Sequence, residues 1–209
     1  MLPRFHLITN FETLDHGALT RLLAVLGEDR AGVPQVDAVQ VRAKRARDRD
    51  VVDWTRRLLT ALSSRPTLVI VNDRLDLALA AGAHGVHLGR DDLSVADARR
   101  LAPAGFLVGA TCRGVEHAVA ARADGADYAG VGPVHASSTK DGLPEPLGLD
   151  VLAATAREIP VIAIGGITAA RGRDELATGA PGIAVVAAVW NHPDPPRAAR
   201  EIAELAHTA

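Results

Sequence analysis

Polar side chains that could bind a ligand are spaced along an apolar run at 38–42. Its valines alternate with Gln40 and Arg42, and Lys44 follows two residues later. Side chains of a β-strand point alternately to its two faces, so the valines can pack beneath helices while Gln40, Arg42 and Lys44 share the other face. Turning glutamine and arginine inward is costly unless a ligand or a counter-charge meets them. The spacing indicates a binding site; the alternative is a strand end whose charges reach solvent.

Amide and carboxylate groups end the next two apolar runs. Asn72 and Asp73 close the first of them, and Asp92 follows the second. On neighbouring strands these groups would stand beside Arg42 and Lys44. Carboxylates there indicate Mg²⁺, which typically takes one or two of them with phosphate oxygens and would help to neutralise a departing pyrophosphate. The alternative is that the two aspartates only begin helices, because aspartate is also a good N-cap.

The longest connection between expected elements spans 132–148 and contains the pair Thr139 and Lys140. Its length, hydroxyl groups and lysine predict a lid that closes a phosphate into the site, and the alternative is a disordered surface loop. His135 in the same segment is a candidate general base near neutral pH. Histidine is common in loops, so a catalytic role for it is the less favoured interpretation.

Two further loops are suited to a phosphate group. Gly165 and Gly166 follow the seventh apolar run, and Val186 and Ala187 end the eighth. Barrel enzymes commonly bind phosphate on these two loops, where N–H groups and a short extra helix face the anion. The other histidines have no metal-ligand spacing and are interpreted as core or solvated residues: His6, His16, His84, His87, His117, His192 and His207.

Eight short apolar runs alternate with longer amphipathic runs, which is the pattern of a parallel α/β fold. The expected strands are 5–9, 38–42, 67–72, 85–88, 107–110, 128–131, 161–164 and 183–186. The expected helices are 17–26, 49–63, 74–81, 94–101, 115–123, 149–158, 169–177 and 196–206. We therefore expect one (β/α)8 TIM barrel over 1–209. An open doubly wound sheet is the alternative, but the chain has no G-x-G-x-x-G switch-point motif.

Composition excludes several classes of partner. A net charge of −2 and a pI near 6.4 give no general attraction to nucleic acid or an anionic membrane, and 3% aromatic residues leave little for base stacking. No apolar stretch approaches the roughly 20 residues of a membrane span. Cys112 is the only cysteine, so we expect a cytoplasmic protein without disulfides. Homo-oligomer formation is left open.

Seven motifs together resemble a known family. They are Gln40-x-Arg42-x-Lys44, Asn72-Asp73-Arg74, His87-Leu88-Gly89-x-x-Asp92-Leu93, Gly125-Ala126-Asp127-Tyr128, Gly132-Pro133, Thr139-Lys140 and Ile164-Gly165-Gly166-Ile167. In order and position they resemble the thiamine-phosphate synthases and their relatives, the thiazole tautomerases, from Leu7 to Ala188. The resemblance implies a TIM barrel that uses Mg²⁺ to join hydroxymethylpyrimidine pyrophosphate to a thiazole phosphate, with release of pyrophosphate.

The same resemblance implies roles for single residues. Gln40 would hold the pyrimidine, and Thr111 would lie near the pyrimidine or the leaving group. Residues implied to bind pyrophosphate are Arg42, Lys44, Asn72 and Lys140. Mg²⁺ would be bound by Asp73 and Asp92. The thiazole phosphate would be positioned by Thr139, Gly166 and the backbone at Val186 and Ala187.

The sequence departs from the family pattern at Ala43, Arg90, Thr111, His135, Ala136, Ser137 and Ala187. Tautomerases typically lose the Asn-Asp pair and the lysine and gain a histidine where this chain has Pro133, so the charged set favours the synthase. A tautomerase, with His135 transferring protons and without a metal, is the alternative enzyme. A barrel that binds the precursors without turnover is the third hypothesis.

Overall fold

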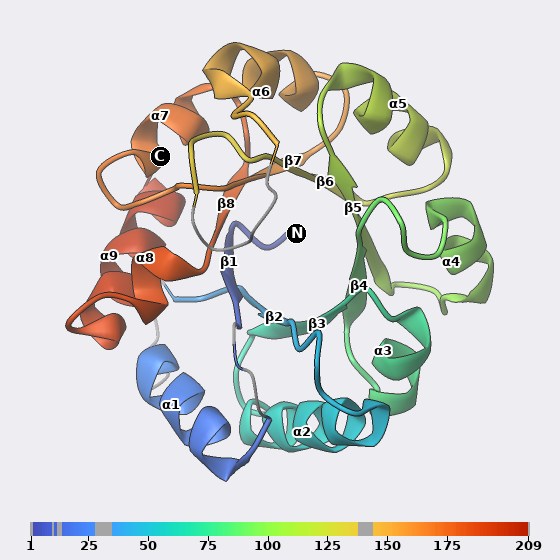
Figure 1. Cartoon of the computed structure of the whole chain (residues 1–209), viewed down its shortest axis with the longest axis vertical. Coiled ribbons are helices and arrows are strands. Elements are labelled where there is room, and N and C mark those ends of the chain that lie inside the picture. The colour runs from blue at the N-terminus through green and yellow to red at the C-terminus, as the bar shows by residue number, and fades with distance from the viewer. Residues whose placement is uncertain (1, 10, 12–13, 28–34, 138–143, 209) are drawn as a thin grey trace.

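Eight parallel strands close into a barrel in chain order, and β8 pairs with β1. The structure is a computed structural model that describes residues 2–9, 11, 14–27, 35–137 and 144–208. Its strands are β1 (Phe5–Ile8), β2 (Ala38–Val41), β3 (Leu68–Asn72), β4 (Gly85–Leu88), β5 (Leu107–Cys112), β6 (Tyr128–Val131), β7 (Val161–Ile164) and β8 (Gly182–Val185). Figure 1 shows the strands as a ring with the helices outside it. The predicted barrel is confirmed. The open-sheet alternative is wrong, because β1 and β8, which would be edge strands in an open sheet, are hydrogen-bonded to each other.

Helices follow the strands at the predicted places. The helices of the described residues are α1 (His16–Leu26), α2 (Asp48–Ala61), α3 (Leu75–Ala81), α4 (Val95–Leu101), α5 (Val115–Ala123), α6 (Gly148–Ala156), α7 (Gly172–Ala177), α8 (Ala187–Trp190) and α9 (Pro195–Thr208). The four-residue α8, directly after β8, is the short extra helix expected beside a phosphate loop. Within the described part of the chain, no helix is both long and apolar enough to cross a membrane.

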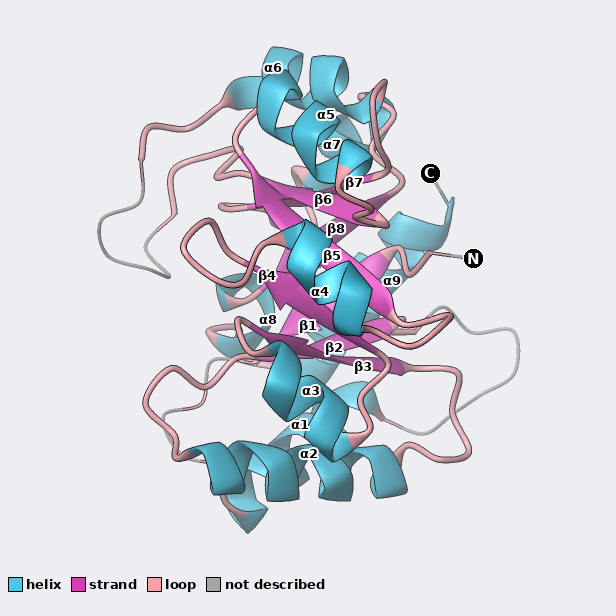
Figure 2. Cartoon of the chain, turned by 90° about the vertical axis from the view of Figure 1, so that its right-hand side faces the viewer, coloured by secondary structure: helices cyan, strands magenta, loops and turns pink. Residues whose placement is uncertain are grey.

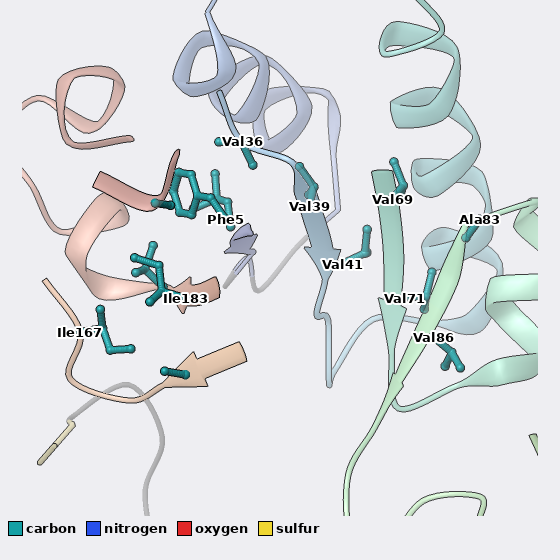
Figure 3. Close-up of a cluster of buried hydrophobic side chains, with 14 of the residues drawn as sticks. Phe5, Val36, Val39, Val41, Val69, Val71, Ala83, Val86, Ile167 and Ile183 are labelled. Carbon is teal, nitrogen blue, oxygen red and sulfur yellow. The ribbon is translucent and has the colours of Figure 1, made fainter. Parts of the chain in front are cut away.

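The main hydrophobic core lies between the outer face of the barrel and the helices. Val39 and Val41 on β2 are opposite Val69 and Val71 on β3, and all four are buried. Figure 3 shows these valines on adjacent strands. Burying each such side chain contributes about 1.5–3 kcal/mol. The alternation predicted for β2 therefore places its valines outside the barrel and leaves Gln40 on the inner face.

The barrel interior is a second layer that contains polar side chains. Its apolar part is the cluster of Ile8, Tyr128, Ile162 and Ala184, and His6 and Gln40 are buried as well. Glycines make room for the larger rings. A Cβ on Gly109 would lie 2.2 Å from the Cζ atom of Tyr128, and a Cβ on Gly130 would lie 2.7 Å from Cε1 of His87.

The two ends of the barrel differ in character. At the amino ends of the strands, Asp37 Oδ2 accepts from the N–H groups of Arg4 (2.9 Å) and Phe5 (2.8 Å). Its Oδ1 lies 3.1 Å from Nε2 of His207 in α9. Figure 2 shows the N and C labels on the same side of the barrel. The amino-terminal end is thus held by hydrogen bonds, while the carboxyl end is where barrel enzymes have their sites.

Candidate active site

A cavity of about 840 Å³ is lined by residues at the carboxyl ends of the strands. Its volume lies within the range of ligand pockets, about 300–1,000 Å³. The expected site residues that line it are Gln40, Arg42, Lys44, Asn72, Asp73, Asp92, Thr111, Gly166, Val186 and Ala187. Thr139 and Lys140 lie outside the described residues. The barrel therefore brings together every expected site residue that the structure describes.

One side of the cavity, at β2 to β4, carries basic side chains. Arg42 and Lys44 follow β2, and Arg90 follows β4. The N–H of Arg42 donates to Oγ1 of Thr9 at 3.0 Å, which fixes the backbone where β2 ends. Asn72 ends β3, and its buried Oδ1 has no hydrogen-bond partner among the described residues. This side combines positive charge with the polar side chain of Asn72.

Asp73 and Asp92 face each other on the same side of the cavity. Burial and the neighbouring charge of Asp92 raise the pKa of Asp73, against the opposing effect of Lys44 and Arg42. Asp92 Oδ2 also accepts from the N–H of Gly89 at 2.6 Å. Two crowded carboxyl groups gain from a nearby cation, so the donor set fits a hard divalent ion. The described residues contain no group of three or more His, Cys, Asp or Glu arranged to hold a metal.

Neither aspartate begins a helix, so the N-cap alternative is wrong. The N-cap of α3 is Arg74, and the N-cap of α4 is Ser94, whose Oγ accepts from the N–H of Asp97 at 3.1 Å. Asp73 instead adopts φ 70°, and the N–H of Arg74 donates to the carbonyl of Asn72 at 2.8 Å across it. This left-handed conformation is costly for a residue with a side chain and is typical of functional sites.

The wall of the cavity contains His87 and Tyr128, which the sequence analysis did not assign to the site. Nδ1 of His87 lies 3.2 Å from the Tyr128 hydroxyl, and Nε2 lies 3.1 Å from Oγ1 of Thr111. Burial lowers the pKa of His87 to about 4 and raises the pKa of Tyr128, so both are neutral near pH 7. The expectation that His87 is a core residue is incomplete, because its place on the inner face exposes it to the cavity.

Glycine lets the loop after β7 lie close to the loop after β6. Gly166 has φ 68°, and a Cβ there would lie 2.6 Å from the carbonyl oxygen of Ala136 and 2.7 Å from Cβ of His135. The next loop, after the neighbouring strand β8, also lines the cavity. In it Val186 is the N-cap of α8, and Ala187 is the first residue of that helix. The first N–H groups of a helix have no partner within the helix. Both expected phosphate loops therefore border the cavity with backbone groups.

His135 does not line the cavity. Its Nε2 contacts Oε1 of Glu175 in α7, and Glu175 is fully buried. The backbone N–H of His135 donates to the carbonyl of Gly165 at 3.0 Å. The cavity lining includes its neighbours Pro133 and Ala136 but does not include His135. The structure therefore gives the imidazole a partner other than a ligand.

A cavity at the carboxyl ends, with basic side chains on one side and backbone N–H groups on the other, is the site of a (β/α)8-barrel enzyme that binds phosphorylated molecules. The family model described as thiamine monophosphate synthase matches residues 7–189. The chain belongs to this family.

Individual proteins that are similar to this chain carry names that agree with the family model. A protein of Salinispora arenicola named thiamine-phosphate synthase is 44% identical over 207 residues, covering 97% of this chain and 97% of the relative. Its namesake in Methanoculleus marisnigri is 43% identical over 189 residues, covering 90% of this chain and 86% of the relative. The solved thiamine phosphate pyrophosphorylase of Pyrococcus furiosus superposes with a TM-score of 0.83 at 31% identity, covering 98% of this chain and 95% of that one. These similarities place the chain among the transferases of thiamine biosynthesis.

Proposed function

We propose that the chain joins hydroxymethylpyrimidine pyrophosphate to a thiazole phosphate and releases pyrophosphate. The observation that carries this proposal is that basic side chains and a glycine loop line different sides of one cavity, and both are suited to bind anions. Arg42, Lys44 and Asn72 follow β2 and β3, while Gly166 follows β7, four strands further round the ring. One side suits a pyrophosphate and the other a single phosphate, which are the charged ends of the two substrates.

The reaction needs little covalent chemistry from the protein. The bond between the pyrimidine methylene carbon and the pyrophosphate oxygen breaks, and pyrophosphate leaves with the electron pair. The thiazole nitrogen then forms the new C–N bond to the methylene carbon. Arg42 and Lys44 would stabilise the negative charge that develops on the leaving group, and electrostatic stabilisation of this kind is often the largest catalytic contribution.

The remaining roles are those that the resemblance to the family implies, and the residues below that the structure describes line the cavity. Gln40 would hold the pyrimidine, and Thr111, hydrogen-bonded to His87, would lie between the pyrimidine and the leaving group. Gly166, Val186 and Ala187 would bind the thiazole phosphate through backbone N–H groups. From the family pattern, Lys140 would bind pyrophosphate and Thr139 the thiazole phosphate.

Asp73 and Asp92 are the residues that would hold Mg²⁺. When bound, the ion would neutralise part of the pyrophosphate charge during bond breaking. Support comes from the place of both carboxyl groups in the cavity lining and from the raised pKa of Asp73, to which burial and the neighbouring charge of Asp92 contribute. Without a cation, the two carboxyl groups would also repel an anionic leaving group.

The tautomerase alternative loses its proposed proton-transfer residue. His135 is bonded to Glu175 and does not line the cavity. A precursor-binding protein without turnover remains distinguishable only by assay. We further propose that the chain acts as a single domain over 1–209 in the cytoplasm. The closed barrel supports the single domain. The lone cysteine supports the cytoplasm, because Cys112 is buried with its pKa raised to about 11 and is unsuited to disulfide exchange.

The test is a product assay with the purified chain. Both substrates with Mg²⁺ should give thiamine phosphate and pyrophosphate in equal amounts, and excess chelator should stop turnover. Asp73→Asn and Asp92→Asn should each raise the Mg²⁺ concentration that gives half-maximal rate. The thiazole carboxylate isomer supplied alone should remain unchanged. Isomerisation of that compound, or binding of both substrates without product, would replace the proposal.

A further inference from the structure

A buried histidine lies behind the pyrimidine end of the cavity. His6 on β1 is fully buried, and its Nδ1 is 2.8 Å from Nε2 of Gln40. Its other ring nitrogen, Nε2, is 3.2 Å from the carbonyl oxygen of Pro3. His6 itself does not line the cavity, whereas Gln40 does. An effect of His6 on a ligand can therefore pass through the hydrogen bond to Gln40, or through the ring of Tyr128, which also lines the cavity.

The contacts of His6 determine which of its nitrogens carries the proton. A carbonyl oxygen only accepts hydrogen bonds, so Nε2 must donate to Pro3 and hold the hydrogen. Burial and the nearby His87 lower the pKa of His6 to about 4, so the ring carries a single N–H near neutral pH. Nδ1 is then a bare acceptor, and the group that faces it must be a donor.

This requirement fixes the orientation of the Gln40 amide. The NH₂ group must point towards His6, because the amide oxygen in its place would set two acceptors against each other. The Oε1 atom is then turned the other way. It is buried and has no hydrogen-bond partner among the described residues. A buried acceptor without a partner costs about 1–3 kcal/mol, which a ligand donor would recover.

We propose that His6 is a positioning residue, which holds the Gln40 amide with its oxygen facing the cavity and so selects a substrate ring that presents an N–H donor. The inference rests on the proposed function and adds a criterion of specificity to it. The ring must carry a group such as an amino substituent at the point nearest Oε1. A ring with an acceptor there, such as a carbonyl oxygen in place of the amino group, meets Oε1 unfavourably.

His6 also has a packing role, which the test must separate from positioning. Its ring lies 5.3 Å from the ring of Tyr128 with an interplanar angle of 59°. Phenylalanine keeps a ring at this position but has no acceptor for Gln40. Asparagine removes the ring but can place its Oδ1 near the position of Nδ1. The two substitutions therefore change packing and hydrogen bonding independently.

The kinetic experiment measures KM for each substrate in the full chain. His6→Phe should raise KM for the pyrimidine substrate about 3- to 10-fold, the effect of one hydrogen bond, while KM for the thiazole phosphate changes less than twofold. His6→Asn should recover most of the loss. In a Gln40→Ala background His6→Phe should have no further effect, because contacting residues that act through one another are not additive.

A matched control is His84→Phe. Nδ1 of His84 accepts from the N–H of Val69 at 2.9 Å, outside the cavity, so its loss should leave both KM values unchanged. Additive effects of His6→Phe and Gln40→Ala, or equal increases in both KM values, would overturn the positioning role. A chain that makes no thiamine phosphate at all would instead refute the proposed function.

A spectroscopic measurement tests the inference without turnover. Nitrogen NMR of the wild-type imidazoles should show His6 as the neutral form with hydrogen on Nε2 at pH 7. This result supports the assigned orientation of Gln40 even if a His6 variant fails to fold. Hydrogen on Nδ1 would require the Gln40 oxygen to face His6 and would overturn the inference.

Discussion

The imidazole of His135 contacts a carboxylate that is fully buried. Nε2 of His135 meets Oε1 of Glu175, and Oε2 of Glu175 has no partner among the described residues. The pair links the loop after β6 to α7, on the far side of Gly166 from the cavity. A buried carboxylate with one partner depends strongly on that partner. His135 therefore belongs to the support of the phosphate loop.

Loss of His135 should affect stability more than chemistry. His135→Phe leaves the buried carboxylate uncompensated, which typically costs about 3–5 kcal/mol. Denaturant unfolding should show this decrease. The double variant His135→Phe with Glu175→Leu removes both polar groups and should regain most of the stability. If the double variant folds but makes no thiamine phosphate, His135 or Glu175 has a direct role in the reaction.

A side chain at Gly166 should weaken binding of the thiazole phosphate. Gly166→Ala combines a positive φ with contacts of 2.6 and 2.7 Å to the loop after β6, so the loop must move. We expect KM for the thiazole phosphate to rise by about tenfold or more, because a displacement of a binding group by about 1 Å can lower the rate by about two orders of magnitude. Gly179→Ala is the control, since Gly179 has φ 92° but no atom within 4 Å of its Cβ position. Equal KM values in the two variants would remove Gly166 from the site.

Arg42 should be required for turnover through its shape as well as its charge. A guanidinium binds phosphate oxygens in a bidentate manner that lysine cannot reproduce. Arg42→Lys should therefore fold normally and lose most of its turnover. Arg74→Lys is the matched control, because Arg74 is exposed and pairs with Asp48 and Asp76 outside the cavity lining.

Thermal unfolding with pyrophosphate distinguishes a binding role of Arg42 from a structural one. Pyrophosphate should stabilise the wild type and Arg74→Lys more than Arg42→Ala. If Arg42→Ala unfolds at a much lower temperature and pyrophosphate stabilises it as much as the wild type, Arg42 belongs to the scaffold.

The strand alternation was enough to predict the barrel and the inward face of Gln40. The alternation could not predict which residues lie opposite each other on neighbouring strands, because this depends on the register of the closed sheet. Gly109 lies opposite Tyr128 and Thr111 opposite Gly130, and this pairing allows His87 to reach Thr111 and Tyr128. The period of two identifies the faces of each strand, but it does not give the level of a residue along the barrel axis.

The backbone conformation of Asp73 is a second feature that the sequence did not predict. Sequence position made Asp73 a candidate both for an N-cap and for a metal ligand. The left-handed turn at Asp73 excludes the cap, and a positive φ at a residue with a side chain has no clear sequence signal. The contact of His135 with Glu175 joins residues 40 positions apart and was likewise outside the reach of local patterns.

The buried His6 should make stability depend on pH. Its pKa is lowered from 6.5 to about 4 in the folded chain, mainly by burial and then by His87, against Pro3 and Asp37. Its contribution is complete above pH 6.5. As the pH falls from 6.5 to about 4, the unfolded chain takes up a proton that the folded chain does not, so folding loses free energy. Below about pH 4 the folded chain is protonated too, and the loss levels off.

We therefore expect the free energy of unfolding to fall by about 2 kcal/mol between pH 7 and pH 5 on account of His6 alone. His6→Phe removes this titration, so its urea unfolding free energy should decrease less over the same interval than that of the wild type. Identical pH dependence in His6→Phe and the wild type would mean that the pKa of His6 is the same in the folded and the unfolded chain, and the assignment of a buried, neutral imidazole would be wrong.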